Sequence, residues 1–304
     1  MATPDTPRLL LLGSDGQVGW ELCRTLAPFG QVIAASLDGA RGPAVDLADA
    51  ASVRRLFSET GPDAVINAAA YTAVDRAESE TEVAMAINGD ALGLIGQLAA
   101  EAGIPVVHYS TDFVFSGETD RPYREDDAPE PRSVYGKSKL AGERALLESG
   151  ATALILRTAW VYGVRGNNFL LTMLRLFRER AELRVVDDQI GTPTWSRMLA
   201  EVTAQILYRA FRGELNLAEV QGLYHVTSGG ATSWYGFAEA IREASCLKCK
   251  LLPIPTSEYP APAPRPAYSV LDTHRFHETF GLALPDWRHS LAMCLGDLQR
   301  VMPD

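Results

Sequence analysis

Tyr135 and Lys139 are four positions apart in the segment Ser133-Val-Tyr-Gly-Lys-Ser-Lys-Leu-Ala-Gly. On a helix, this spacing places both side chains on one face. A free tyrosine has a pKa of about 10 and exchanges protons poorly at neutral pH. A nearby ammonium stabilises the phenolate and lowers that pKa, so the pair predicts a tyrosine active in general acid–base catalysis.

A glycine-rich turn follows the first apolar segment. Its glycines have the spacing G-x-x-G-x-x-G, which differs from the commoner G-x-G-x-x-G. Glycine lets the backbone turn sharply and approach a pyrophosphate, and a helix N-terminus supplies N–H donors with partial positive charge. A tight turn without a ligand is the alternative. The cofactor-binding residues expected at this turn are Gly13, Gly16, Gln17, Val18 and Gly19.

The adenosine side of this site is less defined by the sequence. Ser36 ends the second apolar segment, where many NAD enzymes place an acid on the ribose hydroxyls, and Asp38 comes two positions later. Arg41 is near enough to be considered for a 2′-phosphate. We therefore expect NADPH or NADH and leave the preference open. Asp46, followed by Leu47, is expected either to accept from the adenine amine or to begin the next helix.

Short apolar segments alternate with helical patterns in the first half. Strands are expected at 8–12, 31–35, 64–66, 105–109 and 154–156, and helices at 18–27, 50–59, 82–102 and 134–147. Continuous apolar strands are typical of a parallel sheet buried on both faces, and their alternation with helices indicates right-handed crossovers. The fold class is therefore α/β, a Rossmann-like doubly wound parallel sheet with a smaller C-terminal α/β substrate-binding domain.

The second half is less regular. Helices are expected at 168–180, 195–211 and 234–244, with strands at 183–186 and 223–226. The proline-rich segment 253–266 predicts an irregular loop. We expect residues 1–160 to form an NAD(P)-binding domain and residues 161–304 mainly to bind substrate, and leave open whether later segments return to the first domain.

Composition excludes several classes of partner. The 304-residue chain is 47% hydrophobic and carries a formal net charge of -10, which disfavours nucleic acid and anionic membranes. We find no apolar run of the roughly 18–20 residues that a membrane span requires, and no signal-peptide pattern. Cys246 and Cys249 form a lone C-x-x-C without further zinc ligands, so we expect reduced thiols in a cytoplasmic protein.

Several motifs together give a resemblance that covers essentially the whole chain. The chain resembles the extended short-chain dehydrogenase/reductases and, within them, the dTDP-4-dehydrorhamnose reductase family. Besides the glycine turn and the Tyr135/Lys139 pair, the motifs that carry the resemblance are Asn67–Asp75, His108–Phe115, Arg157–Gly163, Gly166–Phe169, Val186–Thr194 and Arg265-Pro266.

The resemblance implies hydride transfer from NAD(P)H to the C4 ketone of a dTDP-sugar. It implies that Tyr135 protonates the incipient alkoxide, that Lys139 lowers the tyrosine pKa and binds the nicotinamide ribose, and that Thr111 holds the ketone oxygen. The further residues that it implies for the cofactor are Ala68, Ala69 and Ala70. Those that it implies for the substrate, besides Thr111, are Asp112, Phe113, Trp160, Asn168, Gln189 and Arg265. Phe113 departs from the family's usual tyrosine, which removes one hydroxyl from this region.

Some members of this family form metal-bridged dimers through acidic side chains. Glu21 matches one acidic position, but we assign Arg197 and Arg288 to the other two, and arginine cannot bind Mg²⁺. We therefore predict no Mg²⁺ site, with Glu21 either paired with an arginine or without a role. A monomer or a homodimer fits the sequence equally well.

Related functions remain as alternatives. A dehydratase of this superfamily carries an Asp-Glu pair after the threonine, whereas Asp112 is followed by Phe113 here. Another sugar-nucleotide 4-ketoreductase or an epimerase is not excluded by the residues. A non-catalytic NAD(P)-binding subunit, like the regulatory subunit of methionine adenosyltransferase, would not need the Thr/Tyr/Lys set that this chain retains.

Overall fold

The centre of the molecule is a six-stranded sheet in the order β10-β5-β4-β3-β1-β2, in which every neighbouring pair is parallel. The computed structural model describes residues 6–301. The strands are β1 (Arg8–Leu12), β2 (Gln31–Ala35), β3 (Ala64–Asn67), β4 (Val106–Thr111), β5 (Ala153–Thr158) and β10 (Gly222–His225). The chain leaves β1 toward β2 and then returns to β3 on the opposite side. The carboxyl ends of β1 and β3 therefore flank a topological switch point, where open α/β sheets bind ligands.

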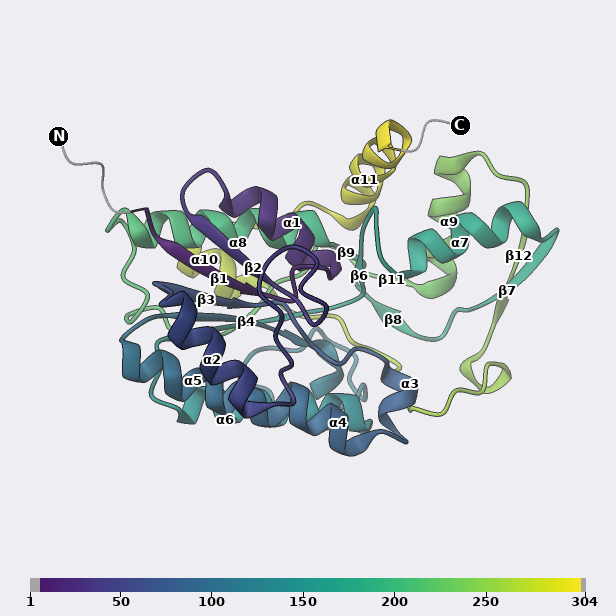
Figure 1. Ribbon diagram of the computed structural model, residues 1–304. Coiled ribbons are helices and arrows are strands. Elements are labelled where there is room, and N and C mark those ends of the chain that lie inside the picture. The colour runs from purple at the N-terminus through teal and green to yellow at the C-terminus, as the bar shows by residue number, and fades with distance from the viewer. Residues whose placement is uncertain (1–5, 302–304) are drawn as a thin grey trace.

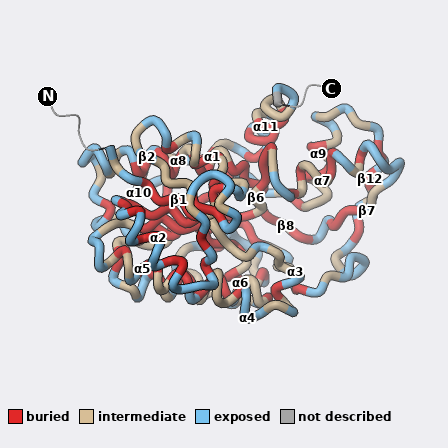
Figure 2. The backbone as a smooth tube through the Cα atoms, in the orientation of Figure 1, coloured by how far each residue is buried: buried red, intermediate tan, exposed pale blue. Residues whose placement is uncertain are grey.

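Helices cover both faces of the sheet (Figure 1). Alternate residues of β1 are fully buried in two different cores, Leu9 and Leu11 in one and Leu10 and Leu12 in the other. This explains why its sequence is continuously apolar. One face carries α2 (Ala50–Thr60), α5 (Ala91–Ala102) and α6 (Val134–Glu148), and the other carries α1 (Gln17–Leu26), α8 (Ser196–Phe211) and α10 (His274–Phe280). Figure 2 shows the buried residues concentrated along the strands between these layers.

The helix expected at 82–102 is interrupted. It consists of α4 (Thr81–Met85), a π-helical turn η1 (Ala86–Asp90) and α5, and a short α3 (Val74–Ala77) precedes it. The segment Thr81–Ala102 has 22 residues and a mean hydropathy of 1.3, enough by length and composition for a membrane span, so our expectation that no such run exists was wrong. Ile95 and Ala99 of this segment are buried in the core against α2 and the sheet, which accounts for its apolar character.

A smaller assembly from the second half has its own apolar core. Its helices are α7 (Phe169–Glu179), α9 (Trp234–Ser245) and α11 (Trp287–Val301), and its paired strands are β7 (Glu182–Val186) with β12 (Lys250–Ile254), β6 (Val161–Tyr162) with β9 (Thr194–Trp195), and β8 (Ile190–Gly191) with β11 (Thr232–Ser233). Figure 1 shows α7, α9, β7 and β12 gathered to one side of the sheet, whereas β10 and α8 return to the sheet itself.

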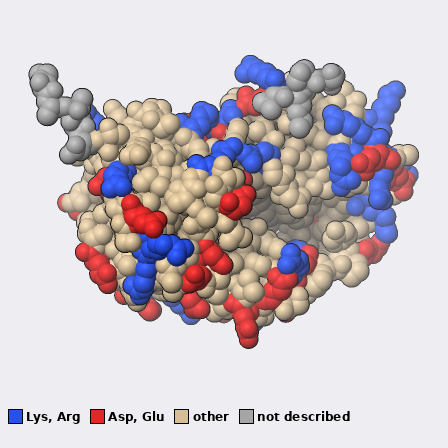
Figure 3. All heavy atoms as spheres, in the orientation of Figure 1, with Lys and Arg blue, Asp and Glu red and all other residues tan. Residues whose placement is uncertain are grey.

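The start of the segment 253–266 is not a loop as we predicted. Pro253 lies within β12, opposite Val185 in the parallel pair with β7. β12 pairs with β7 alone, so a proline is tolerated on its free edge. The rest of the segment contains only the short 3₁₀ turn η3 (Thr256–Glu258) among its described residues. Figure 3 shows that the molecular surface is hollowed where this assembly meets the sheet.

Candidate functional site

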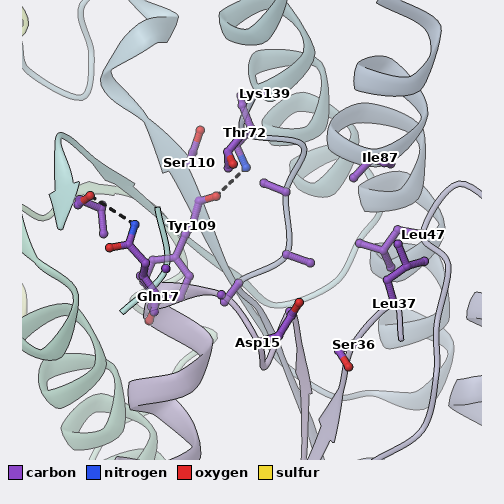
Figure 4. Close-up of a pocket in the computed structure, with 18 of the residues that line it drawn as sticks. Asp15, Gln17, Ser36, Leu37, Leu47, Thr72, Ile87, Tyr109, Ser110 and Lys139 are labelled. Atoms are coloured by element: carbon purple, nitrogen blue, oxygen red, sulfur yellow. Dashed lines mark hydrogen bonds between the residues drawn. The ribbon is translucent and has the colours of Figure 1, made fainter. Parts of the chain in front are cut away.

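A cavity of about 500 Å³ lies at the carboxyl edge of the sheet, beside the switch point (Figure 4). Most of the residues that we predicted for the cofactor line it: Gly13, Gly16, Gln17, Val18, Ser36, Asp46, Leu47, Ala68, Ala69, Ala70, Tyr135 and Lys139. Residues that we did not predict also line it, among them Leu37, Thr72, Ile87, Tyr109, Ser110, Thr158 and Asn167. Most of these lie inside the motifs that carry the family resemblance, whereas Leu37 and Ile87 lie outside those motifs and only the fold identifies them.

The glycine turn is built for close backbone approach. Gly13 has φ +76°, and a Cβ there would lie 2.6 Å from the Ala69 backbone. A Cβ at Gly19 would collide with the Gly13 carbonyl, so Gly19 serves helix packing and is not among the lining residues. Among the described residues, no side chain caps the N-terminus of α1 at Gly16. The first amides of α1 can therefore donate to a pyrophosphate, and the turn fits the expected dinucleotide.

The part of the cavity expected to hold the adenosine is polar. The residue directly after β2 that lines it is Ser36, where many NAD enzymes have an acid. Ser36 is buried and donates its hydroxyl to Asp38 at 2.8 Å. Asp46 lines the cavity and accepts from the Ala48 amide at 2.9 Å. Of the two roles considered for Asp46, capping of α2 belongs instead to Asp49, whose side chain accepts from an amide of the first turn.

Helix α6 carries Tyr135 and Lys139 into this cavity. Ser133 caps the helix by accepting from the Gly136 amide at 3.1 Å. A Cβ at Gly136 would collide with the Phe113 carbonyl, so α6 packs directly against the turn η2 (Asp112–Val114) that follows β4. The Phe113 ring lies edge-on to the Tyr135 ring at 5.6 Å. The end of β4 and the first turn of α6 thus bring Tyr135 and the buried Thr111 hydroxyl together.

The expected effect of Lys139 on the tyrosine is not seen. The pKa of Tyr135 is raised to about 12, because burial outweighs the lowering effect of the Thr111 hydroxyl and the Asp112 carboxylate raises it further. Lys139 Nζ instead lies 2.7 Å from the Tyr109 carbonyl and 3.0 Å from His108 Nε2. Burial lowers the pKa of Lys139 to about 8. Desolvation therefore dominates the pKa of both groups, and the pKa of Tyr135 stays above its ordinary value of 10 instead of falling below it as predicted.

Asp112 is a buried carboxyl beside Thr111 and Tyr135. Its Oδ1 accepts from the Thr111 hydroxyl at 3.0 Å, and that hydroxyl accepts in turn from the Phe113 amide at 3.2 Å. Its Oδ2 has no hydrogen-bond partner in the described part of the chain. Burial, partly offset by Ser269 and Thr111, raises the pKa of Asp112 to about 6. The carboxyl therefore changes charge near neutral pH, directly beside Thr111.

Asn88 ties the cavity wall to α6, and the sequence reading missed it. It lies in the π turn η1, where it accepts from the Tyr71 amide at 2.8 Å and donates to the Ser138 hydroxyl at 3.0 Å. Single π turns occur often at functional sites. The signal that could have found it is a buried amide that interrupts an otherwise apolar helical run.

A second cavity, of about 610 Å³, lies between α7, β7 and the segment after β12. Gln189 and Arg265 line it, together with the aromatic residues Phe169, Trp234 and Tyr259. Arg265 donates to Asp75 at 2.9 Å, which links this wall to α3 beside the sheet. Two of the residues predicted to bind substrate, Gln189 and Arg265, therefore share this second cavity.

Asn168 faces neither cavity directly. Its amide donates to the Gln17 side chain and to the Gly163 and Arg165 carbonyls at 2.9–3.1 Å, and its oxygen caps α7. These bonds engage the side chain fully, so Asn168 holds the two parts of the molecule together in this arrangement.

Trp160 is held in an uncommon conformation. Its φ is +47°, in the left-handed region that bulky residues rarely adopt. Its ring stacks on Trp234 with centroids 3.5 Å apart and an interplanar angle of 4°. The Trp234 indole donates to Gln189 at 3.2 Å. A Cβ at Gly191 would collide with the Trp160 ring, so glycine is required beneath the stack. The stack thereby connects the end of β5 to the second cavity.

Glu21 pairs with arginine, which confirms one of the two outcomes that we considered. Its buried carboxylate lies 3.3 Å from both Arg24 and Arg197, and Arg197 also pairs with Asp297. Arg288 instead stacks on Trp287. Within residues 6–301, no group of three His, Cys, Asp or Glu side chains is arranged to bind a metal ion.

Comparison with known proteins identifies the family. The family described as RmlD substrate binding domain matches residues 7–300. The chain belongs to this family. It is 46% identical to the dTDP-4-dehydrorhamnose reductase of Burkholderia thailandensis over 299 residues, covering 96% of this chain and 99% of that protein. It is also 46% identical to the reductase of Escherichia coli K12 over 296 residues, covering 95% and 97%.

Solved structures of the family share the fold. The dTDP-4-dehydrorhamnose reductase of Bacillus anthracis in complex with NADP matches with a TM-score of 0.88 at 33% identity, covering 96% of this chain and 99% of that one. The Clostridium acetobutylicum reductase matches with the same TM-score at 36% identity and the same coverage. The α/β fold with a parallel central sheet is thus that of the RmlD reductases, as the sequence predicted.

Gly191→Ala should separate the Trp160–Trp234 stack, because the added methyl group would occupy the space of the Trp160 ring. We expect a smaller near-UV circular dichroism signal from the coupled indoles and weaker substrate binding. The control is Gly296→Ala on α11, where a Cβ would meet no described atom within 4 Å. An unchanged tryptophan signal in Gly191→Ala would contradict this packing requirement.

Asp112→Asn should stabilise the protein at alkaline pH. Burial raises the pKa of Asp112 from the ordinary 3.8 to about 6 in the native state. The native protein is therefore most stable relative to the unfolded chain when Asp112 is protonated in both states, and it loses stability as pH rises from about 4 through 6. The variant should therefore gain about 2–3 kcal/mol in free energy of unfolding at pH ~8 and nothing below pH ~4, measured by urea denaturation. Asp127→Asn is the opposite control, because Arg121 and other donors lower the pKa of Asp127 to about 2. Equal stability of wild type and Asp112→Asn at alkaline pH would refute the burial cost.

Proposed function

We propose that this protein reduces the C4 ketone of dTDP-4-dehydro-β-L-rhamnose to dTDP-β-L-rhamnose with NADPH or NADH, the last step of dTDP-L-rhamnose synthesis. The observation that carries the proposal is the meeting of Tyr135, Lys139 and the glycine turn in one cavity, with the Thr111 hydroxyl beside the phenol. Full-length similarity to reductases of this name supports the same reaction. Its product would serve the synthesis of cell-surface polysaccharide.

Tyr135 is the proton donor in this proposal. When bound, the nicotinamide supplies a hydride to the ketone carbon. The raised pKa of Tyr135, about 12, keeps the phenol protonated at neutral pH, which is the form that a reduction requires. The Thr111 hydroxyl would exchange its hydrogen bond to Asp112 for one to the ketone oxygen, and so hold that oxygen next to the phenol. Lys139 in its charged form would stabilise the phenolate left after proton donation.

The second cavity is suited to the nucleotide of the substrate. Aromatic side chains offer a stacking surface for a base, and the guanidinium groups of Arg184 and Arg265 can pair with a diphosphate. Gln189 would contact the same portion. The Trp160–Trp234 stack would form the wall between the nucleotide and the sugar, with Asp112 and Phe113 on the sugar side.

The alternatives lead to different products. An epimerase would return the sugar unreduced and keep its cofactor oxidised or reduced without net consumption. A non-catalytic subunit would bind NAD(P)H and leave the sugar unchanged. The UDP-glucose 4-epimerase of Thermus thermophilus shares the fold at 21% identity, and this level of similarity supports no activity. Net oxidation of NADPH by the 4-keto sugar distinguishes the reductase from both.

We infer a cytoplasmic enzyme that is a monomer or a homodimer. The four cysteines are free thiols, which fits a reducing compartment. The paired charges around Glu21 support an assembly that does not depend on a bridging Mg²⁺.

Tyr135→Phe should lower kcat by ~10²-fold or more while NADPH still binds, because only the donated proton is lost. Stopped-flow absorbance and cofactor titration measure the two properties separately. The matched control is Tyr162→Phe, since the buried Tyr162 hydroxyl has no hydrogen-bond partner among residues 6–301 and lies outside the cavity. Near-normal turnover in Tyr135→Phe would refute the role of the phenol.

Ser36→Asp should shift cofactor use toward NADH. A carboxylate at the end of β2 would accept from the ribose hydroxyls of NADH and repel the 2′-phosphate of NADPH. We expect the ratio of kcat/KM for NADPH to that for NADH to fall by about tenfold or more, which corresponds to about 1.4 kcal/mol. Ser36→Ala controls for loss of the Asp38 hydrogen bond. An unchanged ratio would show that Ser36 does not face the ribose.

A further inference from the structure

We propose that His108 is a positioning residue that sets the place and the charge of Lys139. The proposal rests on the catalytic role given above to Lys139 and adds a residue with no contact to the reacting atoms. Lys139 Nζ is fixed between His108 Nε2 at 3.0 Å and the Tyr109 carbonyl at 2.7 Å. His108 is fully buried and Lys139 is 2% exposed, so water does not compete for these contacts.

The hydrogen-bond pattern fixes the tautomer of His108. The Ala69 amide can only donate, so the Asn67 atom facing it at 3.1 Å is the side-chain oxygen. The Asn67 NH₂ group therefore faces His108 Nδ1 at 3.2 Å, and Nδ1 must accept. The ring is neutral, because burial and then the charge of Lys139 hold the pKa of His108 well below its usual range, against a raising contribution from the Asn67 carbonyl. A neutral imidazole that accepts at Nδ1 carries its proton on Nε2.

This tautomer favours the uncharged form of Lys139. The Nε2–H of His108 can hydrogen-bond to Nζ only if the amine offers its lone pair, whereas an ammonium would set two donors against each other. Protonation of Lys139 would force the ring to reverse its tautomer and turn Nδ1–H against the Asn67 NH₂. Charged Lys139 therefore costs a buried hydrogen bond, either the one from Nε2–H to Nζ or the one from Asn67 to Nδ1. This loss adds to the cost of desolvating the ammonium.

The other charged groups around Lys139 do not reverse this effect. Glu143, one turn further along α6, raises the pKa of Lys139 but is neutralised by Arg157 of β5, with Nε at 2.8 Å and Nη2 at 2.6 Å. On β4, the phenol of Tyr109 is bonded to Thr203 at 2.7 Å, on the opposite face of the sheet. Asp112 acts on Tyr135, which precedes Lys139 by one turn.

The consequence is an upper limit on the pH range of the reaction. The charged amine is the form that would stabilise the phenolate of Tyr135, and burial lowers the pKa of Lys139 to about 8 against the raising effect of Glu143. The hydrogen bond from His108 Nε2–H acts in the same direction as burial. The stabilising charge is therefore present below that pH and is lost as pH rises through it. In this proposal the tautomer of His108 helps to set the pH at which Lys139 loses its charge.

Lysine NMR tests the proposal without turnover, because the chain has only four lysines, Lys137, Lys139, Lys248 and Lys250. Titration of the ¹³Cε resonances should show the Lys139 resonance with a midpoint near pH 8. In His108→Leu, the low midpoint should rise by about one pH unit. Asn67→Asp should raise it without removing the ring, because a carboxylate accepts from Nδ1–H and turns Nε2 into an acceptor.

The matched control is His225→Leu, which removes another buried imidazole, bonded to the Tyr123 carbonyl at 3.1 Å, and should leave the lysine midpoints unchanged. Above pH 8, where Lys139 is neutral, wild-type ¹⁵N spectra should show His108 protonated at Nε2. Protonation at Nδ1 above pH 8, a Lys139 midpoint that does not lie near pH 8, or an unmoved Lys139 midpoint in either folded variant would overturn the proposal. Failure of the protein to reduce the sugar would leave these readouts intact and would count against the proposed function alone.

Discussion

Desolvation at the junction of β4 and α6 is the constraint on which the site depends. It acts on Tyr135 and Lys139 in opposite senses, because the charged form is the phenolate in one case and the ammonium in the other. Burial raises the pKa of the Tyr135 phenol to about 12 and lowers the pKa of the Lys139 ammonium to about 8. Below pH 8 the tyrosine is in its proton-donating form and the lysine is charged, whereas above pH 8 the lysine loses its charge while the tyrosine stays protonated.

The fold maintains this desolvation by filling the space around the pair. Gly136 allows α6 to pack against η2, and Asn88 anchors the same helix to the loop after β3. Behind them, Glu143 and Arg157 form a fully buried ion pair. Removing one partner would leave an uncompensated buried charge under α6, which typically costs several kcal/mol. These residues hold the geometry, although they do not contact the expected ligands.

Sequence patterns were sufficient for the sheet and the cofactor turn, since both depend on local rules. Continuous apolar runs became the central strands, and the spacing of Gly13, Gly16 and Gly19 marked the switch point. The patterns failed where tertiary contacts override propensity. The π turn around Asn88 looks like an ordinary helix, and Pro253 looks like a loop until β7 provides an edge for it. The short strands β6, β8, β9 and β11 have two residues each and no periodicity to detect.

The electrostatics of the site could be predicted only in part. The spacing of Tyr135 and Lys139 correctly indicated that both belong to one cavity, but it could not reveal that Nζ is directed at His108. That contact requires β3, β4 and α6 to be placed together, because Asn67, His108 and Lys139 come from three separate elements. The partner of Trp160 was hidden for the same reason, since Trp234 lies 74 positions later in the chain.

The central claim is that this protein delivers hydride to C4 of a dTDP-4-keto sugar while Tyr135 supplies the proton. The most direct measurement mixes the purified protein with dTDP-4-dehydro-β-L-rhamnose and NADPH deuterated at the transferred position, and analyses the nucleotide sugar by NMR. The account predicts one equivalent of oxidised cofactor and dTDP-β-L-rhamnose with deuterium at C4. Unreduced sugar, or a product without deuterium at that carbon, would contradict it.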